Sequence, residues 1–296
     1  MTVTPRQPWH GVLVATALPF RADLSVDLDR FADHVRWLAA AGCHGVCPNG
    51  SLGEYQVLTA DERAAVVRTA VDVAPDGFAV VPGVGAYGAF EARRWAEAAA
   101  EAGAQAVLSL PPNTYRGDDR AVVQHYREVA AAGLPVVAYN NPIDTKIDLQ
   151  PELLAALHGE GLIVGVKEFT GDPRRGYRIA ELAPELDLII GTDDSVLELA
   201  LAGAKGWIAG FPNSLPRLCV DLYEAALAHD LDTALPLYRD LHPLLRWDYR
   251  TEFVQAIKLS MDVAGRYGGP CRPPRQPLLA DQEEEIRHTM SMIMNT

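Results

Sequence analysis

The stretch VVAYNNPIDTKIDLQPELLAALHGEGLIVGVKE, residues 136–168, contains two strand patterns separated by a helix pattern. The apolar runs Val136–Tyr139 and Ile163–Glu168 are nearly continuous, which is typical of strands that are buried on both faces. Between them, Pro151–Leu157 predicts a helix. A strand, a helix and a second strand in this order favour a parallel sheet that is covered by helices.

The same alternation extends over most of the chain. Further apolar runs lie at Val12–Ala17, Gly45–Cys47, Ala79–Val84, Ala106–Leu110, Leu188–Ile190 and Gly206–Ala209. A helical pattern follows each run, and several of these helices end in Ala-Gly, where glycine is the expected stop. Eight such units predict an α/β fold, a (β/α)8 TIM barrel over residues 1–229, in preference to an open doubly wound sheet.

After about residue 230 the strand patterns stop. Helical patterns at Asp232–Arg246, Glu252–Ala264 and Asp281–Ile293 predict a C-terminal helical extension, residues 230–296, that packs on the barrel. Earlier in the chain, Thr59 and Glu62 have the spacing of a capping box at the start of a helix.

Composition excludes several classes of function. The 296 residues carry a formal net charge of −13, which repels phosphate backbones and anionic lipid, so we expect neither nucleic acid nor membrane as a partner. We find no apolar run of about 18 residues and no signal-peptide pattern, and we expect a cytoplasmic protein. Cys43 and Cys47 lack a second pair at metal-ligand spacing, so buried thiols are favoured over a zinc site.

Two residues at strand ends point to chemistry, because barrel enzymes place catalytic groups there. Lys167 is one of four lysines among 26 basic residues, and only an amine can condense with a carbonyl. Desolvation inside a barrel should lower the pKa of this amine. The alternative is a buried ion pair with Glu168 or another carboxylate. Tyr139 ends the neighbouring run and is suited to move a proton, although a core aromatic would look the same.

The loop after the second run reads Asn49-Gly50-Ser51-Leu52-Gly53-Glu54. Two glycines three residues apart let backbone amides converge on an anion, here a carboxylate. The Ser51 hydroxyl is placed to relay a proton to Tyr139. An ordinary turn is the alternative interpretation of this loop.

Taken together, these motifs resemble the dihydrodipicolinate synthase and N-acetylneuraminate lyase superfamily over nearly the whole chain. The matching segments, in order, are GSLGE (50–54), LT with DER (58–63), PP (111–112), YNNP (139–142), GVKE (165–168), GTDD (191–194) and GWIAGFPN (206–213). The resemblance implies that Lys167 forms a Schiff base with a small-molecule 2-oxo acid, that Tyr139 shuttles protons, and that the amides of Ser51 and Leu52 hold the carboxylate. It also implies a homotetramer built from tight dimers and a family that needs no metal; we expect no cofactor.

Further residues are expected to bind substrate on the same grounds: Gly50, Asn113, Tyr115, Asp144, Ala209 and Gly210. Two of them depart from the synthase pattern. Asp144 stands where those synthases have an arginine that grips the second substrate. Tyr115 stands one place later than their paired tyrosine, which completes a relay across the dimer interface.

The resemblance therefore predicts a metal-independent class I lyase or aldolase, and Asp144 argues against lysine biosynthesis. The GSLG loop and the KEF sequence at 167–169 are similar to a branch that deaminates hydroxylated pyrroline carboxylates. Three alternatives stay open: an aldolase acting on 4-hydroxy-2-oxoglutarate or on deoxy sugar acids, a 4-hydroxy-tetrahydrodipicolinate synthase, and an inert barrel that only binds a 2-oxo acid or sugar acid.

Overall fold

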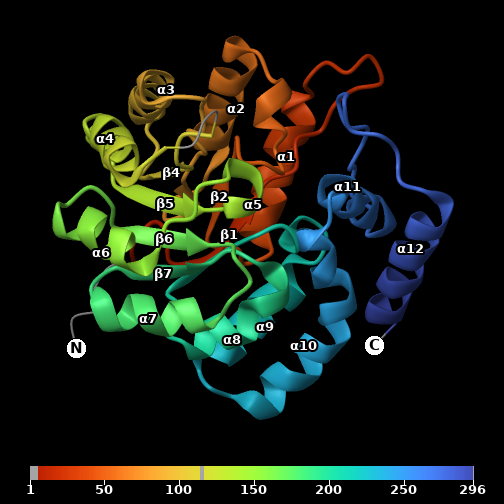
Figure 1. Ribbon diagram of the computed structural model, residues 1–296. Helices are drawn as coiled ribbons and strands as arrows, with labels where there is room; N and C mark the ends of the chain where they lie inside the picture. Colours follow the sequence, from red (N-terminus) through yellow and green to blue (C-terminus); the bar gives the residue numbers. More distant parts are fainter. Residues whose placement is uncertain (1–5, 114–116, 296) are drawn as a thin grey trace.

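Eight parallel strands form the centre of the molecule (Figure 1), in a computed structural model that describes residues 6–113 and 117–295. The strands are β1 (Gly11–Ala15), β2 (Gly45–Cys47), β3 (Ala79–Val80), β4 (Val107–Ser109), β5 (Val136–Asn140), β6 (Gly165–Glu168), β7 (Asp187–Ile190) and β8 (Gly206–Ala209). Their order in the sheet is β3-β2-β1-β8-β7-β6-β5-β4, so every sequential pair except β3 and β4 is joined by a regular ladder.

A shorter contact between β3 and β4 closes the barrel. Gly83 and Leu108 form a parallel bridge, in which the Val84 amide donates to the Leu108 carbonyl at 2.9 Å. The Leu108 amide donates in turn to the Pro82 carbonyl at 3.0 Å. Gly83 is required here, since a Cβ at this position would lie 2.4 Å from the carbonyl oxygen of Asn49. The predicted (β/α)8 barrel is confirmed.

Helices surround the strands on all sides (Figure 1). The barrel helices are α1 (Leu28–Ala40), α2 (Ala60–Val73), α3 (Ala89–Ala102), α4 (Asp119–Ala130), α5 (Pro142–Thr145), α6 (Pro151–Gly159), α7 (Arg174–Leu182), α8 (Val196–Leu201) and α9 (Pro216–Leu227). The predicted capping box at the start of α2 is present, with Thr59 and Glu62 each accepting from the other's amide. None of the helices in the described part of the chain is long and apolar enough to span a membrane.

Three further helices, α10 (Leu231–Leu245), α11 (Phe253–Val263) and α12 (Ala280–Met294), follow the barrel. They are blue in Figure 1, where α10 packs on α9 and α12 lies on the outside against α10 and α11. A 3-10 turn, η4 (Arg246–Tyr249), joins α10 to α11; similar turns are η1 (Tyr55–Val57), η2 (Asp193–Ser195) and η3 (Phe211–Asn213). Through η4 the extension reaches the end of β6, where Tyr249 stacks on Phe169.

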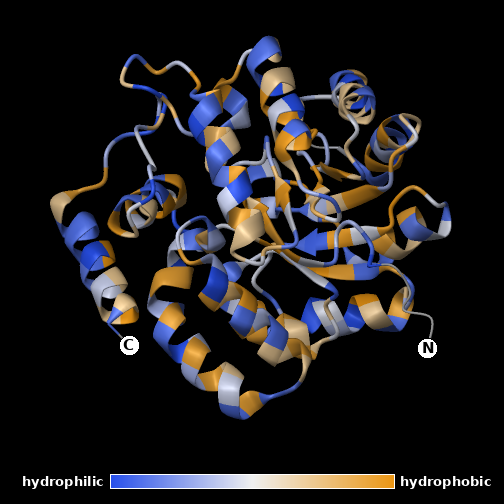
Figure 2. Ribbon diagram, turned by 180° about the vertical axis from the view of Figure 1, so that it is seen from behind, coloured by the Kyte–Doolittle hydropathy of each residue, from blue (hydrophilic) through white to orange (hydrophobic). Residues whose placement is uncertain are grey.

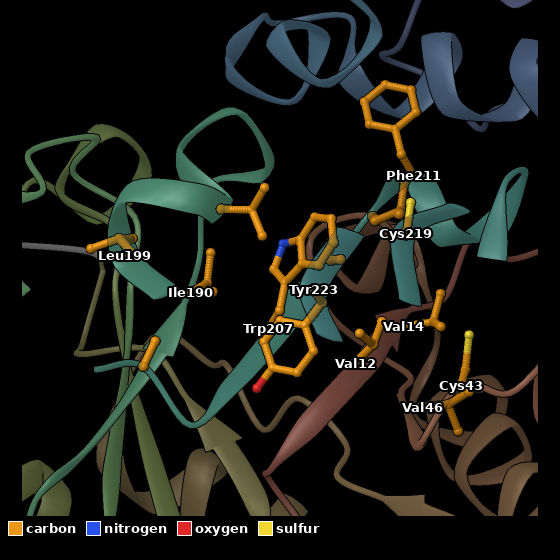
Figure 3. Close-up of a cluster of buried hydrophobic side chains, with 14 of the residues drawn as sticks. Val12, Val14, Cys43, Val46, Ile190, Leu199, Trp207, Phe211, Cys219 and Tyr223 are labelled. Atoms are coloured by element: carbon orange, nitrogen blue, oxygen red, sulfur yellow. The ribbon is translucent and has the colours of Figure 1, made fainter. Parts of the chain in front are cut away.

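Two apolar layers make the core. The outer layer lies between strands and helices, where Trp207 and Ile190 of the strands meet Cys219 and Tyr223 of α9 (Figure 3). The helices carry hydrophobic residues toward the strands and hydrophilic residues outward (Figure 2). The inner layer fills the barrel with residues such as Leu13. Because side chains alternate along a strand, this division decides which residues face the site.

Candidate active site

Lys167 and Tyr139 lie side by side at the end of the barrel interior. They are paired residues in the ladder between β5 and β6, and each is 6% exposed. The Lys167 Nζ lies 4.4 Å from the centroid of the Tyr139 ring and 5.7 Å from that of Phe169. Among residues 6–113 and 117–295 we find no hydrogen bond or ion pair to this amine. The amine therefore faces the cavity without a carboxylate bound to it.

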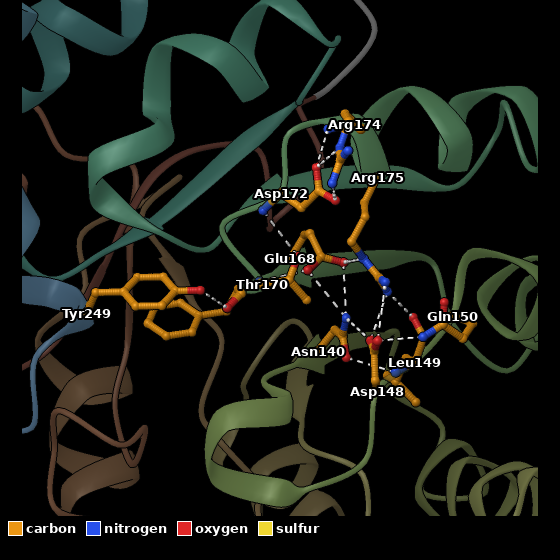
Figure 4. A network of polar contacts seen from close by, with 11 residues as sticks. Asn140, Asp148, Leu149, Gln150, Glu168, Thr170, Asp172, Arg174, Arg175 and Tyr249 are labelled. Carbon is orange, nitrogen blue, oxygen red and sulfur yellow. Dashed lines mark hydrogen bonds and ion pairs between the residues drawn. The ribbon is translucent and has the colours of Figure 1, made fainter.

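Glu168 points to the opposite face of β6 (Figure 4). Its carboxylate accepts from Asn140 Nδ2 at 3.1 Å and from the Thr170 amide at 2.8 Å, and it pairs with Arg175 at 3.2 Å. The alternative in which Lys167 is held in an ion pair with Glu168 is wrong, because consecutive side chains of a strand face opposite sides.

Burial sets the protonation of both groups. It lowers the pKa of the Lys167 amine, while Asp248, Cys47 and Asp193 act in the opposite direction. Burial also raises the pKa of the Tyr139 hydroxyl well above 10, so the phenol keeps its proton at neutral pH. Asn141 Nδ2 donates to that hydroxyl oxygen at 3.3 Å.

The loop after β2 presents unused donors. Ser51 Oγ is buried and has no hydrogen-bond partner among the described residues. The backbone amides of Ser51 and Leu52 likewise donate no hydrogen bond to any of the described residues. At the end of the loop, the Glu54 carboxylate is held by Lys258 Nζ at 2.7 Å and by the Arg272 amide at 3.0 Å. Donors without partners beside a cavity are suited to a carboxylate.

A cavity of about 410 Å³ joins these groups. The predicted residues that line it are Lys167, Tyr139, Gly50, Ser51, Leu52, Asn113, Asp144 and Gly210. Tyr115 lies outside the described residues. The prediction that Ala209 binds substrate is wrong. Its side chain belongs to the outer apolar layer, and its neighbours Ile208 and Gly210 line the cavity instead. The cause is the alternation of side chains along β8.

Several residues that line the cavity were not predicted, and six of them come from the C-terminal extension. Asp248, Tyr249, Arg250 and Thr251 follow α10 and lie in the cavity wall. The Tyr249 ring stacks on Phe169, with ring centroids 5.2 Å apart and planes 5° apart. The Tyr249 hydroxyl also donates to the Phe169 carbonyl (Figure 4). No motif near residue 248 signals that this turn reaches the end of β6.

Asp193, from the GTDD segment, does not line the cavity but holds the turn that does. Its carboxylate accepts from Trp207 Nε1 at 3.0 Å and from the amides of Gly210 and Phe211 at 2.9 and 3.0 Å. Three donors occupy both of its oxygens, so Asp193 fixes the turn after β8. In the described residues, no three His, Cys, Asp or Glu side chains gather as metal ligands would.

Known proteins resemble this chain in sequence and in fold. The Dihydrodipicolinate synthetase family matches residues 8–293. A 4-hydroxy-tetrahydrodipicolinate synthase of Methanospirillum hungatei is 32% identical over 96% of this chain and 99% of its own length. An uncharacterized DapA-like lyase of Halobacterium salinarum is 35% identical over 94% and 91%.

Among solved structures, a prophage protein of the dihydrodipicolinic acid synthase family from E. coli K12, in complex with pyruvate, superposes with a TM-score of 0.90. It is 26% identical, and the match covers 96% of this chain and 98% of that one. The chain therefore belongs to the dihydrodipicolinate synthetase family, whose members are lyases.

Proposed function

We propose that this protein forms a Schiff base between the Lys167 amine and the ketone carbon of a pyruvate-like 2-oxo acid. The observation that carries the proposal is the buried, unpaired amine at the end of β6, which faces a cavity in the described part of the chain. Lowering of its pKa by burial supplies free amine near neutral pH. The pyruvate complex of the E. coli relative supports the choice of ligand.

The surrounding groups fit the steps that follow. The amine adds to the ketone carbon, and loss of water leaves an iminium that draws electrons from the adjacent carbon. The unused amides of Ser51 and Leu52 are suited to hold the substrate carboxylate. Tyr139, which keeps its proton, is suited to move a proton to and from carbon, with the Ser51 hydroxyl as a relay.

Replacement of Lys167 by arginine tests the proposal. Lys167→Arg keeps the positive charge but removes the nucleophile, because a guanidinium does not lose its proton at neutral pH. With pyruvate in D2O, the wild type should exchange the methyl protons through the enamine, and the variant should not, as followed by NMR. Exchange by the variant at the wild-type rate would contradict the assignment. Circular dichroism checks that the variant is folded.

We further propose that the reaction is not the condensation of lysine biosynthesis. Asp144 lies at the exposed mouth of the cavity, with its carboxylate held by Asn141 Nδ2 at 2.9 Å. A carboxylate there repels the carboxylate of aspartate semialdehyde. Because several relatives are named 4-hydroxy-tetrahydrodipicolinate synthase, the condensation is the second candidate.

A comparison of substrates separates the two candidates. We expect faster turnover of a hydroxylated pyrroline carboxylate or of 4-hydroxy-2-oxoglutarate than of pyruvate with aspartate semialdehyde. A higher kcat/KM for the condensation would overturn this choice and leave the Schiff-base proposal standing.

The resemblance also leads us to propose a cytoplasmic homotetramer. Phe90, which is 79% exposed at the start of α3, is an apolar side chain that a subunit interface would cover. Light scattering should then give about four times the mass of one chain; the mass of a single chain would refute the tetramer.

A further inference from the structure

Asp248 is a carboxylate in the cavity wall that the proposed function, on which this inference rests, leaves without a role. It lies in η4, between α10 and α11, and lines the same cavity as Lys167 and Tyr139. Its Oδ2 accepts from the Asp193 amide at 3.1 Å. Among the described residues no other hydrogen bond reaches this carboxylate, so its second oxygen is unused.

The turn that carries Asp248 is held firmly on both sides. Trp247 is fully buried beneath it, and Tyr249 stacks on Phe169. Phe169 in turn meets the Tyr139 ring edge to face, with centroids 6.1 Å apart. The aromatic series from Tyr139 to Tyr249 therefore fixes the turn that carries Asp248 against the ends of β5 and β6.

Charge links Asp248 to both reactive groups. Of all charged groups, Asp248 has the largest influence on the pKa of Lys167 and on that of Tyr139. Burial, with Asp193 nearby, raises the pKa of Asp248 well above its usual range. Burial therefore favours a protonated carboxyl beside a free amine, which is the combination that carbonyl addition requires.

The neighbouring acids are already engaged elsewhere. Both oxygens of Asp193 are occupied by three donors. The Asp144 carboxylate lies at the mouth and accepts from Asn141. Tyr139 keeps its proton on the β5 side of Lys167, whereas Asp248 approaches from the extension. Among the described residues that line the cavity, Asp248 is thus the one partly buried carboxyl with a free oxygen.

We propose that Asp248 is a catalytic acid for Schiff-base formation and the counter-ion of the iminium. In the step that it serves, the nitrogen lone pair of the carbinolamine forms the C=N bond while the C–O bond breaks. The Asp248 carboxyl gives its proton to the departing hydroxide, which leaves as water. The resulting carboxylate faces the positive iminium, so charge is created as a pair and no other reactant is needed.

Asp248→Asn is the sharpest test, since asparagine keeps an oxygen to accept from the Asp193 amide but cannot donate a proton as an acid. The rate of adduct formation is measured by mixing protein with pyruvate, quenching with borohydride at fixed times and weighing the intact protein. We expect adduct formation about 10²-fold slower or more, within the range for loss of a general acid.

The pH profile distinguishes an acid from a merely structural residue. Asp248 must carry its proton to act as the acid, so the wild-type rate should fall as the pH rises through the raised pKa of Asp248, and Asp248→Asn should lack this fall. The titratable groups that face this pair are Tyr139 on β5, Cys47 on β2, Asp144 after β5, Asp193 and Asp194 after β7, and Tyr249 in η4. Asp194→Asn removes a nearby carboxylate outside the cavity lining and is the matched control; because the Asp194 charge has only a minor influence on the pKa of Asp248, it should change the rate and the profile far less than Asp248→Asn does.

The outcomes are separable. If Asp248→Asn labels at the wild-type rate with the wild-type pH profile, Asp248 has no part in the step. An equal effect of Asp194→Asn would reduce the result to general charge and also overturn the inference. If the asparagine variant does not fold, Asp248→Ser is expected to show the same loss of rate. Absence of labelling in the wild type itself would remove the proposed function and this inference together.

Discussion

Two lysines are buried in this protein, and their surroundings give them different chemistry. Lys258 is 2% exposed, and its ammonium binds the Glu54 carboxylate at 2.7 Å and the Pro270 carbonyl at 2.8 Å. Lys167 has aromatic rings as its neighbours and no bonded partner in the described residues. A charged, occupied ammonium is a poor nucleophile, whereas a desolvated amine is a good one. Burial alone therefore does not distinguish the two lysines, but their partners do.

At the same scale, Tyr139→Phe should slow exchange of the pyruvate methyl protons by about 10²–10⁴-fold, because it removes the proton donor but leaves the ring. NMR in D2O measures the exchange rate. Tyr126→Phe is the control: Tyr126 is also fully buried, but its hydroxyl donates to the Ser109 carbonyl outside the cavity lining. Equal rates in wild type and Tyr139→Phe would take Tyr139 out of the mechanism.

At the scale of elements, the loop that would bind the carboxylate depends on the C-terminal extension. Glu54 ends this loop with a positive φ of 53°, a conformation that costs a residue with a side chain about 1–3 kcal/mol. The buried ion pair with Lys258 of α11 holds it there, and the backbone of Arg272 adds a hydrogen bond. The extension thus positions both Asp248 and the Gly50–Glu54 loop.

Lys258→Met should accordingly destabilise the fold by about 3–5 kcal/mol, because it leaves the Glu54 carboxylate buried without its partner. Urea denaturation measures the free energy of unfolding. The matched surface change is Arg36→Ala, which breaks the exposed pair with Asp33 and should cost less than about 1 kcal/mol. Similar losses in the two variants would show that the buried pair does not anchor the loop.

Most elements could be predicted because each has its own periodic pattern. The run at Gly206–Ala209 coincides with β8, and Pro151–Leu157 falls within α6. The run Ala79–Val84 became only a two-residue strand, since the chain leaves the ladder after Val80 and pairs again at Gly83. The four-residue helix α5 is too short to give a pattern.

The site residues that lie on predicted strands could be placed from the sequence, and those on turns could not. Lys167 and Tyr139 end apolar runs, so their position at one end of the barrel follows from the fold. Asp248 lies about 80 residues after Lys167 in the chain, in a turn between helices, and no local pattern records that contact. To place Ala209 correctly, one must know which residues of β8 point into the barrel. A short apolar run that is buried on both faces does not show this.

At the scale of the whole molecule, buried histidines should make stability depend on pH. Burial lowers the pKa of His34, on α1, and of His125, on α4, to about 4 each, and burial likewise lowers that of the partly buried His44 to about 4. In the unfolded chain these histidines take up protons near pH 6.5, whereas in the folded protein they do so only near pH 4. Stability therefore decreases as the pH is lowered from 6.5 to 4. Each fully buried ring contributes up to about 3 kcal/mol.

A single variant isolates the contribution of one histidine. It is needed because the carboxyls of Asp193 and Asp248 have raised pKa values and therefore add stability as the pH falls. His34→Gln removes the ring that bonds Asn213 at 2.9 Å. The stability difference between wild type and variant should shrink from pH 7 to pH 4.5, as measured by urea denaturation at each pH. A difference that does not change with pH would contradict burial of a neutral His34.

The central claim is that the Lys167 amine, and no other, bonds covalently to the substrate. Reduction of the protein with borohydride in the presence of pyruvate, followed by peptide mass spectrometry, tests it directly. The account predicts added mass on the peptide that contains Lys167 and none on the peptide that contains Lys258. An adduct on another lysine, or none on Lys167 with pyruvate, 4-hydroxy-2-oxoglutarate or the hydroxypyrroline carboxylate, would contradict it.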